Sequence, residues 1–225
     1  MFKKIKEAIP DFNPKKFILD FEAAAINAIE HVFPEAVIHG CFVHFQRSVY
    51  RKAKSLGLLD HEETSAYVRM CICLAYLPSN KIEDGWLAII ENSLPAEPVT
   101  KFNNYFVEQW LEPDGMIAKW CCYKEQHRST NLVEAWNNRL KCHLGSNPTL
   151  LLFLQVMLID IASYDTAQEK LRLKAIPITK KKRKSIINEK TIAKLTKDYA
   201  EGHTALTKFL EDLSEIVLIT PKKTE

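Results

Sequence analysis

The stretch KKFILDFEAAAINAIEHVFPEAVIHGCFVHFQRSV, residues 15–49, decides the fold. Its first apolar run, KFIL, ends at Asp20 and predicts a short buried strand; its second, AVIHG, ends at Cys41 and predicts another. The alanine-rich segment between them, residues 21–33, predicts a helix that Pro34 stops. Strand, helix and strand in such a short stretch form a βαβ unit.

The two strands of a βαβ unit are parallel neighbours joined by a right-handed crossover. Asp20 and Cys41 are therefore expected side by side at the carboxyl ends of the strands, the edge at which open α/β sheets bind ligands. In the intervening helix, Ala24, Ala28 and either Val32 or His31 recur along one face. The sequence thus predicts that a carboxylate and a thiol meet at one edge of a sheet.

From residue 42 onward the pattern is almost wholly helical, with Phe42, Phe45, Val49 and Lys52 along one stripe. We therefore expect an α/β protein that is predominantly helical. Further helices are expected to end before Pro78, Pro95 and the turn EPDG at 112–115, and two more to cover residues 130–140 and 149–174.

Length and composition are those of an ordinary globular protein: 225 residues, of which 47% are hydrophobic and 26% charged. This length suits one domain of generous size, or a core with an appended piece. The net charge is only +3. Contact with nucleic acid would therefore have to come from local basic clusters.

Cellular location is predicted from what the sequence does not contain. The first residues, MFKKIKEAIPDF, hold no apolar core of a signal peptide, and the apolar run at 150–159 contains Gln155 and is too short to span a bilayer. The six cysteines form no CxxC pair and no recognisable disulfide or zinc framework. We expect no membrane association and a reducing compartment: the nucleus, or otherwise the cytoplasm.

Three sites carry polar groups that suit chemistry, and each has a simpler interpretation. Asp20 could hold a metal ion, or it could cap the helix that follows it. Cys41 and His44 could be half of a zinc site, or a core thiol with a packed or hydrogen-bonded histidine. Glu134 lies beside Trp136 in the polar segment HRSTNLVEAWNNRLK; it could be functional, or part of a solvated helix face.

Basic residues gather in two places. The first cluster interleaves with Tyr50 and could neutralise phosphates while the aromatic ring stacks on a base. The second, KKKRK at residues 180–184, suits a nuclear localisation signal or a solvated linker. The residues of the first cluster are Arg47, Arg51, Lys52 and Lys54.

The order of these segments resembles the Mutator-like (MULE) transposases. The matching residues are DFEAA, then VFPEAVIHGCFVHFQ, and downstream RSTNLVEAWNNRLK followed by NPTLLLFL. In the downstream motif, RSTNLVEAWNNRLK, Leu132 stands where the family has asparagine and Asn137 where it has histidine. The resemblance covers roughly residues 1–160, with residues 161–225 as a helical, lysine-rich tail.

The resemblance implies a ribonuclease-H-like core whose acidic residues hold two divalent ions, Mg²⁺ or Mn²⁺, for cleavage and strand transfer of DNA. On this interpretation Asp20 and Glu134 are catalytic metal ligands, Cys41 and His44 support the site, and residues 45–125 form a helical insertion. The expected partners are DNA (transposon ends and target) and a second copy of the chain. The residues expected to contact DNA are Arg47, Arg51, Lys52, Lys54 and Arg128.

One departure from the family concerns activity. The first acid of the family precedes the segment equivalent to residues 2–9, so the chain as given provides two of three acids. We therefore expect it to be inactive in DNA cleavage on its own. The alternative is a non-catalytic DNA- or protein-binding remnant of a transposable element.

Overall fold

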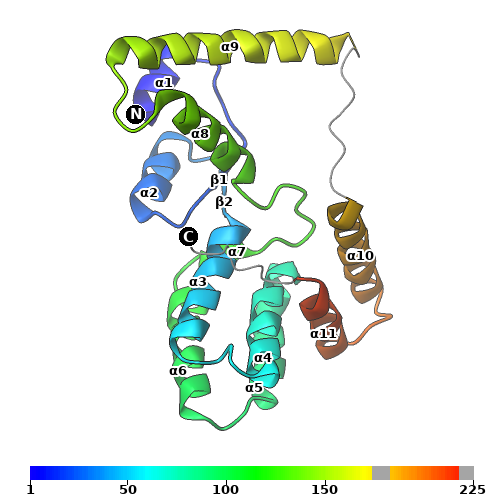
Figure 1. Cartoon of the computed structure of the whole chain (residues 1–225). Helices are drawn as coiled ribbons and strands as arrows, with labels where there is room; N and C mark the ends of the chain where they lie inside the picture. The colour runs from blue at the N-terminus through cyan, green and yellow to red at the C-terminus, as the bar shows by residue number, and fades with distance from the viewer. Residues whose placement is uncertain (174–182, 218–225) are drawn as a thin grey trace. The chain divides into compact units, whose positions relative to one another are not determined.

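The computed structural model describes residues 1–173 and 183–217, without the side chains of 183–185. These residues are predominantly helical, with a two-stranded parallel sheet, as predicted (Figure 1). The elements are α1 (Phe2–Ala8), β1 (Lys16–Leu19), α2 (Ala23–Val32), β2 (Val37–Gly40), α3 (Phe42–Ser55), α4 (Glu62–Cys73), α5 (Ile82–Glu91), α6 (Glu97–Phe106), α7 (Met116–Trp120), α8 (Asn131–Leu144), α9 (Leu150–Arg172), α10 (Arg183–Ala200) and α11 (Leu206–Ile216), with short turns of 3₁₀-helix at Leu74–Tyr76 and Ser79–Lys81 and of π-helix at Val107–Leu111.

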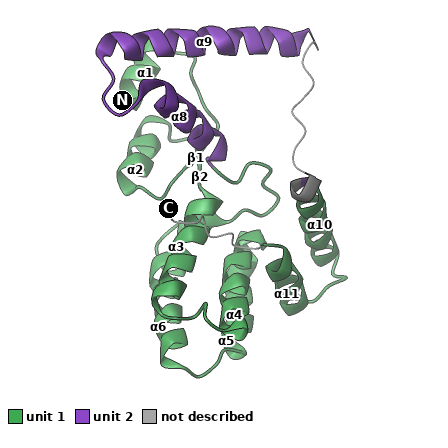
Figure 2. Cartoon of the chain, in the orientation of Figure 1, with its two compact units in different colours: residues 1–129, 187–225 green, residues 130–186 purple. Residues whose placement is uncertain are grey.

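The chain divides into two compact units (Figure 2). Unit 1 combines residues 1–129 with 187–225, and unit 2 is residues 130–186. The boundary expected at residue 160 falls inside α9, which continues to Arg172. The basic run at 180–184 lies outside the described residues, apart from the backbone of 183 and 184 at the start of α10.

The βαβ unit forms as predicted. β1 and β2 are parallel neighbours, and Leu19 pairs with Gly40 at their carboxyl ends. The face of α2 that carries Ala24 and Ala28 is exposed, whereas Ile26 and Ile29 are buried. An isoleucine removes far more apolar area from water than an alanine, so the branched residues determine how α2 is oriented.

The two faces of the sheet are lined differently. On one face the ring of Phe17 lies 6.0 Å from that of Phe2 in α1 and 5.3 Å from that of Phe33 after α2. Side chains alternate along a strand, so Lys16 and, on the paired strand, His39 are on the opposite face. That face lies against α7 and the segment after it.

Aromatic side chains from α3, α5, α6 and α7 fill the core of unit 1. The ring of Phe45 stacks on Trp120 at 4.8 Å, and the ring of Phe106 stacks on Trp86 at 4.9 Å. The indole Nε1–H of buried Trp120 donates to the carbonyl of Trp110 at 2.8 Å, so the polar atom of this large side chain is satisfied. Between residues 45 and 125 the chain contains only helices and connections, as expected for that segment.

The helix α11 belongs to this core. Phe209, Leu210 and Leu213 are buried, and α11 packs against α4 and α5. Gly85 in α5 allows a close approach, because a Cβ there would lie 2.6 Å from Leu77 and 2.7 Å from Leu74. The second half of the chain therefore completes a core that the first half begins.

Unit 2 consists of the helices α8 and α9. The Asp160 carboxylate of α9 accepts hydrogen bonds from Trp136 Nε1 at 2.7 Å and from Arg139 Nη2 at 2.5 Å, both in α8. The Thr149 hydroxyl caps α9 by accepting from the N–H of Leu152 at 3.2 Å.

By length and composition alone, α9 is long and apolar enough to cross a membrane.

Candidate functional site

Asp20 and Cys41 meet at the carboxyl edge of the sheet, where the sequence places them. Each follows the last residue of its strand, and the Cys41 N–H donates to the Leu19 carbonyl at 2.6 Å. Asp20 is exposed, whereas Cys41 is fully buried. The carboxylate is therefore presented to solvent beside a thiol that is part of the core.

Phe21 fixes the backbone next to Asp20. Its ring lies 5.0 Å from that of Trp110, edge to face, and it covers Gly40 so closely that a Cβ there would overlap it. The segment that leaves β1 is thereby attached to the helical core. Asp20 is consequently held at the sheet edge by a packed neighbour instead of lying on a free loop.

The helix α3 starts at the same edge. Cys41 occupies its N-cap position, and the N–H groups of His44 and Phe45 donate to the Cys41 carbonyl at 3.0 and 3.1 Å. The N–H of Phe42 donates to the carbonyl of Arg128 at 2.8 Å. Because the N-terminus of a helix carries a partial positive charge, this arrangement favours anionic groups near Asp20 and Cys41.

Another buried thiol, that of Cys122, interacts electrostatically with Cys41, and burial raises the pKa of Cys122 to about 12. Cys41 and His44 belong to no group of three or more close metal-ligating side chains in the described part of the chain. Their role as structural support of the site stays a prediction.

The predicted DNA-contacting residues on α3 lie in two environments. Arg47, Arg51 and Lys54 follow a helical spacing of four and three residues, on the side of α3 away from Phe45 and Val49. Lys52 instead places its Nζ 5.3 Å from the ring centre of Tyr105. Three of the four cations on α3 therefore form a basic stripe, in which Arg51 and Lys54 are exposed and Arg47 is half-buried.

Arg128 packs against the protein instead of projecting from it. Its guanidinium carbon lies 5.2 Å from the ring centre of Tyr76, a buried residue. Burial raises the pKa of Tyr76, and the positive charge of Arg128 opposes this effect. Arg128 thus packs against a buried residue of unit 1. Its contact with DNA stays a prediction.

Glu134 occupies the first turn of α8, in unit 2, and is half-buried. Its N–H donates to the carbonyl of Thr130, the residue that precedes the helix, at 2.9 Å. Asp20 belongs to unit 1 and Glu134 to unit 2. The expected sharing of a metal ion by these two carboxylates stays a prediction.

A second polar cluster on the sheet was not predicted from the sequence. The carboxylate of Glu125 forms an ion pair with Lys16 of β1 and lies 3.5 Å from His39 Nε2 of β2. Burial and, next, Lys16 lower the pKa of His39, while Glu125 and the backbone of Cys121 act in the opposite direction. This cluster joins both strands to the segment after α7.

A third cluster combines Asp198, Glu201 and His203 at the end of α10, where the ligand atoms lie within 4.8 Å of one another. Among the described residues, this is the group of three side chains close enough together to hold a metal ion. Glu201 and His203 are exposed, and the Glu201 carboxylate also forms an ion pair with Lys197 at 3.7 Å. No motif in the sequence indicates it. It contains neither Asp20 nor Glu134.

Comparison with known proteins identified no relative: no protein-family model, no curated protein and no solved structure matches the chain.

Proposed function

We propose that the chain derives from the catalytic domain of a Mutator-like transposase with a ribonuclease-H-like core, and that Asp20 and Glu134 share a divalent metal ion. The observation that carries the proposal is the position of Asp20: it is exposed at the carboxyl edge of two parallel strands, beside Cys41 and the start of α3. Carboxylate oxygens are the ligands that Mg²⁺ and Mn²⁺ prefer.

Such an ion would activate a water or 3′-hydroxyl and stabilise the leaving oxygen at a DNA phosphodiester. The residues of this chain would contribute one carboxylate each from Asp20 and Glu134, with Cys41 and His44 supporting the edge. Two carboxylates are fewer than a two-metal centre uses, so the 225-residue chain is proposed to bind metal and DNA without cutting DNA.

The test is Mn²⁺ binding followed by electron paramagnetic resonance. Asp20→Asn and Glu134→Gln are each expected to weaken Mn²⁺ binding about tenfold, and the double variant is expected to be little worse than either single variant, because the two residues hold one ion. Asp11→Asn, another exposed carboxylate of unit 1, serves as the control. Additive effects of the two substitutions, or an effect of only one, would contradict a shared ion.

The second candidate function is binding of DNA without chemistry. The basic stripe on α3 favours it, because Arg47, Arg51 and Lys54 lie on one face of a helix whose opposite face is buried. A nuclear protein that contacts DNA phosphates through α3 needs no metal ion. This candidate is distinguished from the first by DNA binding that is unchanged in Asp20→Asn and Glu134→Gln.

A further inference from the structure

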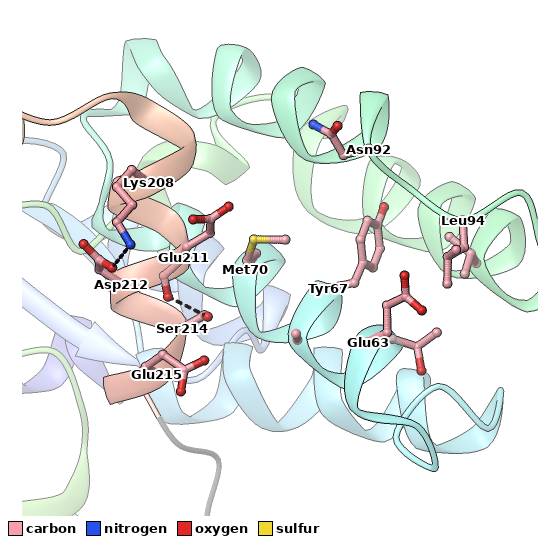
Figure 3. Close-up of a pocket in the computed structure, with 13 residues that line it drawn as sticks. Glu63, Tyr67, Met70, Asn92, Leu94, Lys208, Glu211, Asp212, Ser214 and Glu215 are labelled. Atoms are coloured by element: carbon pink, nitrogen blue, oxygen red, sulfur yellow. Dashed lines mark hydrogen bonds and ion pairs between the residues drawn. The ribbon is translucent and has the colours of Figure 1, made fainter.

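Unit 1 contains a half-open cavity of about 430 Å³ on the side of the helical core formed by α4, α11 and the connection from α5 to α6 (Figure 3). Its volume falls in the range of sites that bind small molecules. None of the residues predicted from the sequence to carry function lines it.

The middle of the cavity is apolar. Tyr67 and Met70 of α4 line it together with Leu94 and Val99 from the α5–α6 side (Figure 3). The hydroxyl of Tyr67 donates to Asn103 Oδ1 at 2.7 Å, so the polar end of this side chain is engaged elsewhere. The central surface therefore suits an alkyl chain.

Carboxylates stand on both sides of this apolar strip. Glu63 lies on the α4 side, next to Tyr67 and Leu94, and Glu211 and Glu215 lie on the α11 side (Figure 3). Among the residues whose side chains the structure describes, 1–173 and 186–217, these three glutamates form no ion pair. The single lysine of the lining, Lys208, is paired with Asp212 at 2.8 Å.

The uncharged polar groups of the lining mostly offer acceptors. The Thr64 hydroxyl donates to the His61 carbonyl at 3.2 Å, and the Ser214 hydroxyl donates to the Glu211 carbonyl at 2.8 Å. Asn92 Nδ2 likewise donates to the Ala88 carbonyl at 3.1 Å. The two hydroxyls have thus used their hydrogens, Asn92 has used one of its two N–H donors, and all three side chains keep oxygen lone pairs for a donor ligand.

We propose that this cavity binds a linear aliphatic polyamine, with its methylene chain along Tyr67 and Met70 and its ammonium groups against Glu63 on one side and Glu211 and Glu215 on the other. An ammonium group supplies positive charge and hydrogen-bond donors, and the one ammonium group of the lining, that of Lys208, is paired with Asp212. The apolar strip favours a ligand with methylene groups between its charges over a hydrated metal cation. This site is separate from Asp20 and Glu134 and does not depend on the proposed function.

The experiment titrates the full chain with spermidine, 1,8-diaminooctane and Mg²⁺ at constant ionic strength. Binding is measured by calorimetry and by the NMR signal of the Met70 ε-methyl group, which reports on the cavity itself. Both amines are expected to bind one per chain and to shift the Met70 signal, whereas Mg²⁺ is expected to leave it unchanged. An equal shift with Mg²⁺ would show attraction of any cation and would overturn the proposal.

Substitutions separate the cavity from general surface charge. The variant Glu63→Gln/Glu211→Gln/Glu215→Gln is expected to bind spermidine about tenfold more weakly, since each partly exposed ion pair contributes a small factor. The control Glu7→Gln/Asp11→Asn/Glu35→Gln removes the same charge from exposed positions of unit 1 outside the cavity, and its affinity is expected to match wild type. Equal weakening of both variants, or binding of a lysine-rich peptide in the absence of spermidine binding, would refute the polyamine assignment.

Discussion

The ring of Phe21 covers Gly40 at the end of β2 so closely that a Cβ at residue 40 would overlap it. The same ring lies edge to face on Trp110, so one side chain joins the βαβ unit to the helical core. The ring of Phe21, and not an unusual backbone angle, therefore requires a glycine at residue 40. Gly40 is not among the glycines with positive φ, which are Gly57, Gly115, Gly145 and Gly202. Four predictions follow from this contact and from others described above.

Gly40→Ala is expected to lower the free energy of unfolding by about 1–3 kcal/mol, the usual cost of overpacking. Glycine-to-alanine substitutions in compatible strands normally stabilise, so the expected sign is the reverse of the ordinary one. Urea unfolding measures the change. In a Phe21→Leu background the same substitution should cost less, because the smaller side chain can yield. Equal costs in the two backgrounds would show that Phe21 does not require the glycine.

His39 is expected to make the protein less stable in mild acid. Because its pKa is lowered in the folded state, chiefly by burial, the unfolded chain takes up the proton first as the pH falls. The contribution of His39 to stability is therefore fully present above about pH 6.5 and is lost as the pH falls through its folded pKa. The loss between pH 8 and pH 5.5 should be smaller in His39→Gln than in wild type. His127→Gln, an exposed histidine, should keep the wild-type pH dependence.

Asp160→Ala is expected to destabilise the pair of helices in unit 2 by about 0.5–1.5 kcal/mol, since the exposed donors of Trp136 and Arg139 lose their acceptor but can bond to water instead. Hydrogen exchange should accelerate at the amides of α8, while the amides of α4 in unit 1 serve as an internal reference. Asp165→Ala, on the exposed side of the same helix, should leave the exchange of α8 unchanged. Equal acceleration in both variants would mean that loss of helix charge, and not loss of these hydrogen bonds, is responsible.

Replacing Arg47, Arg51 and Lys54 with alanine is expected to weaken binding to duplex DNA and to reduce its salt dependence. Each phosphate contact contributes about 0.9 to the magnitude of the slope of log affinity against log salt concentration. The magnitude of this slope is therefore expected to decrease by about two to three in the variant. Fluorescence anisotropy over a range of salt concentrations measures the slope. The control variant, in which Lys3, Lys4 and Lys15 are replaced, removes the same charge from exposed positions. A wild-type affinity that does not vary with salt would exclude phosphate contacts by α3.

Elements with strong local signals were predictable. The strand that ends at Asp20 and the strand that ends at Cys41 have short apolar runs bounded by polar residues, and the structure pairs them in parallel. Prolines marked several helix ends, and α4 and its 3₁₀ extension stop before Pro78 as expected. The position of Asp20 at the sheet edge followed from this local pattern together with the geometry of a βαβ unit.

Features that depend on distant partners were not predictable. Glu125 gives no local sign that it pairs with Lys16 on β1, and nothing around Phe21 shows that its ring covers Gly40. The cavity beside Met70 is assembled from α4 and α11, which are remote in sequence. The alanine spacing of α2 gives no sign that Ile26 and Ile29 form its buried face, which their larger apolar area explains.

The packing of α11 on α4 has a consequence for synthesis on the ribosome. The apolar surfaces of α4 and α5 emerge early, but Phe209, Leu210 and Leu213, which cover part of them, are translated only after unit 2. The nascent chain carries this unprotected surface until α11 emerges, a period in which chaperones bind and aggregation begins. A premature stop codon before residue 206 would leave the early helices permanently uncovered, and the product would be a substrate for cellular quality control.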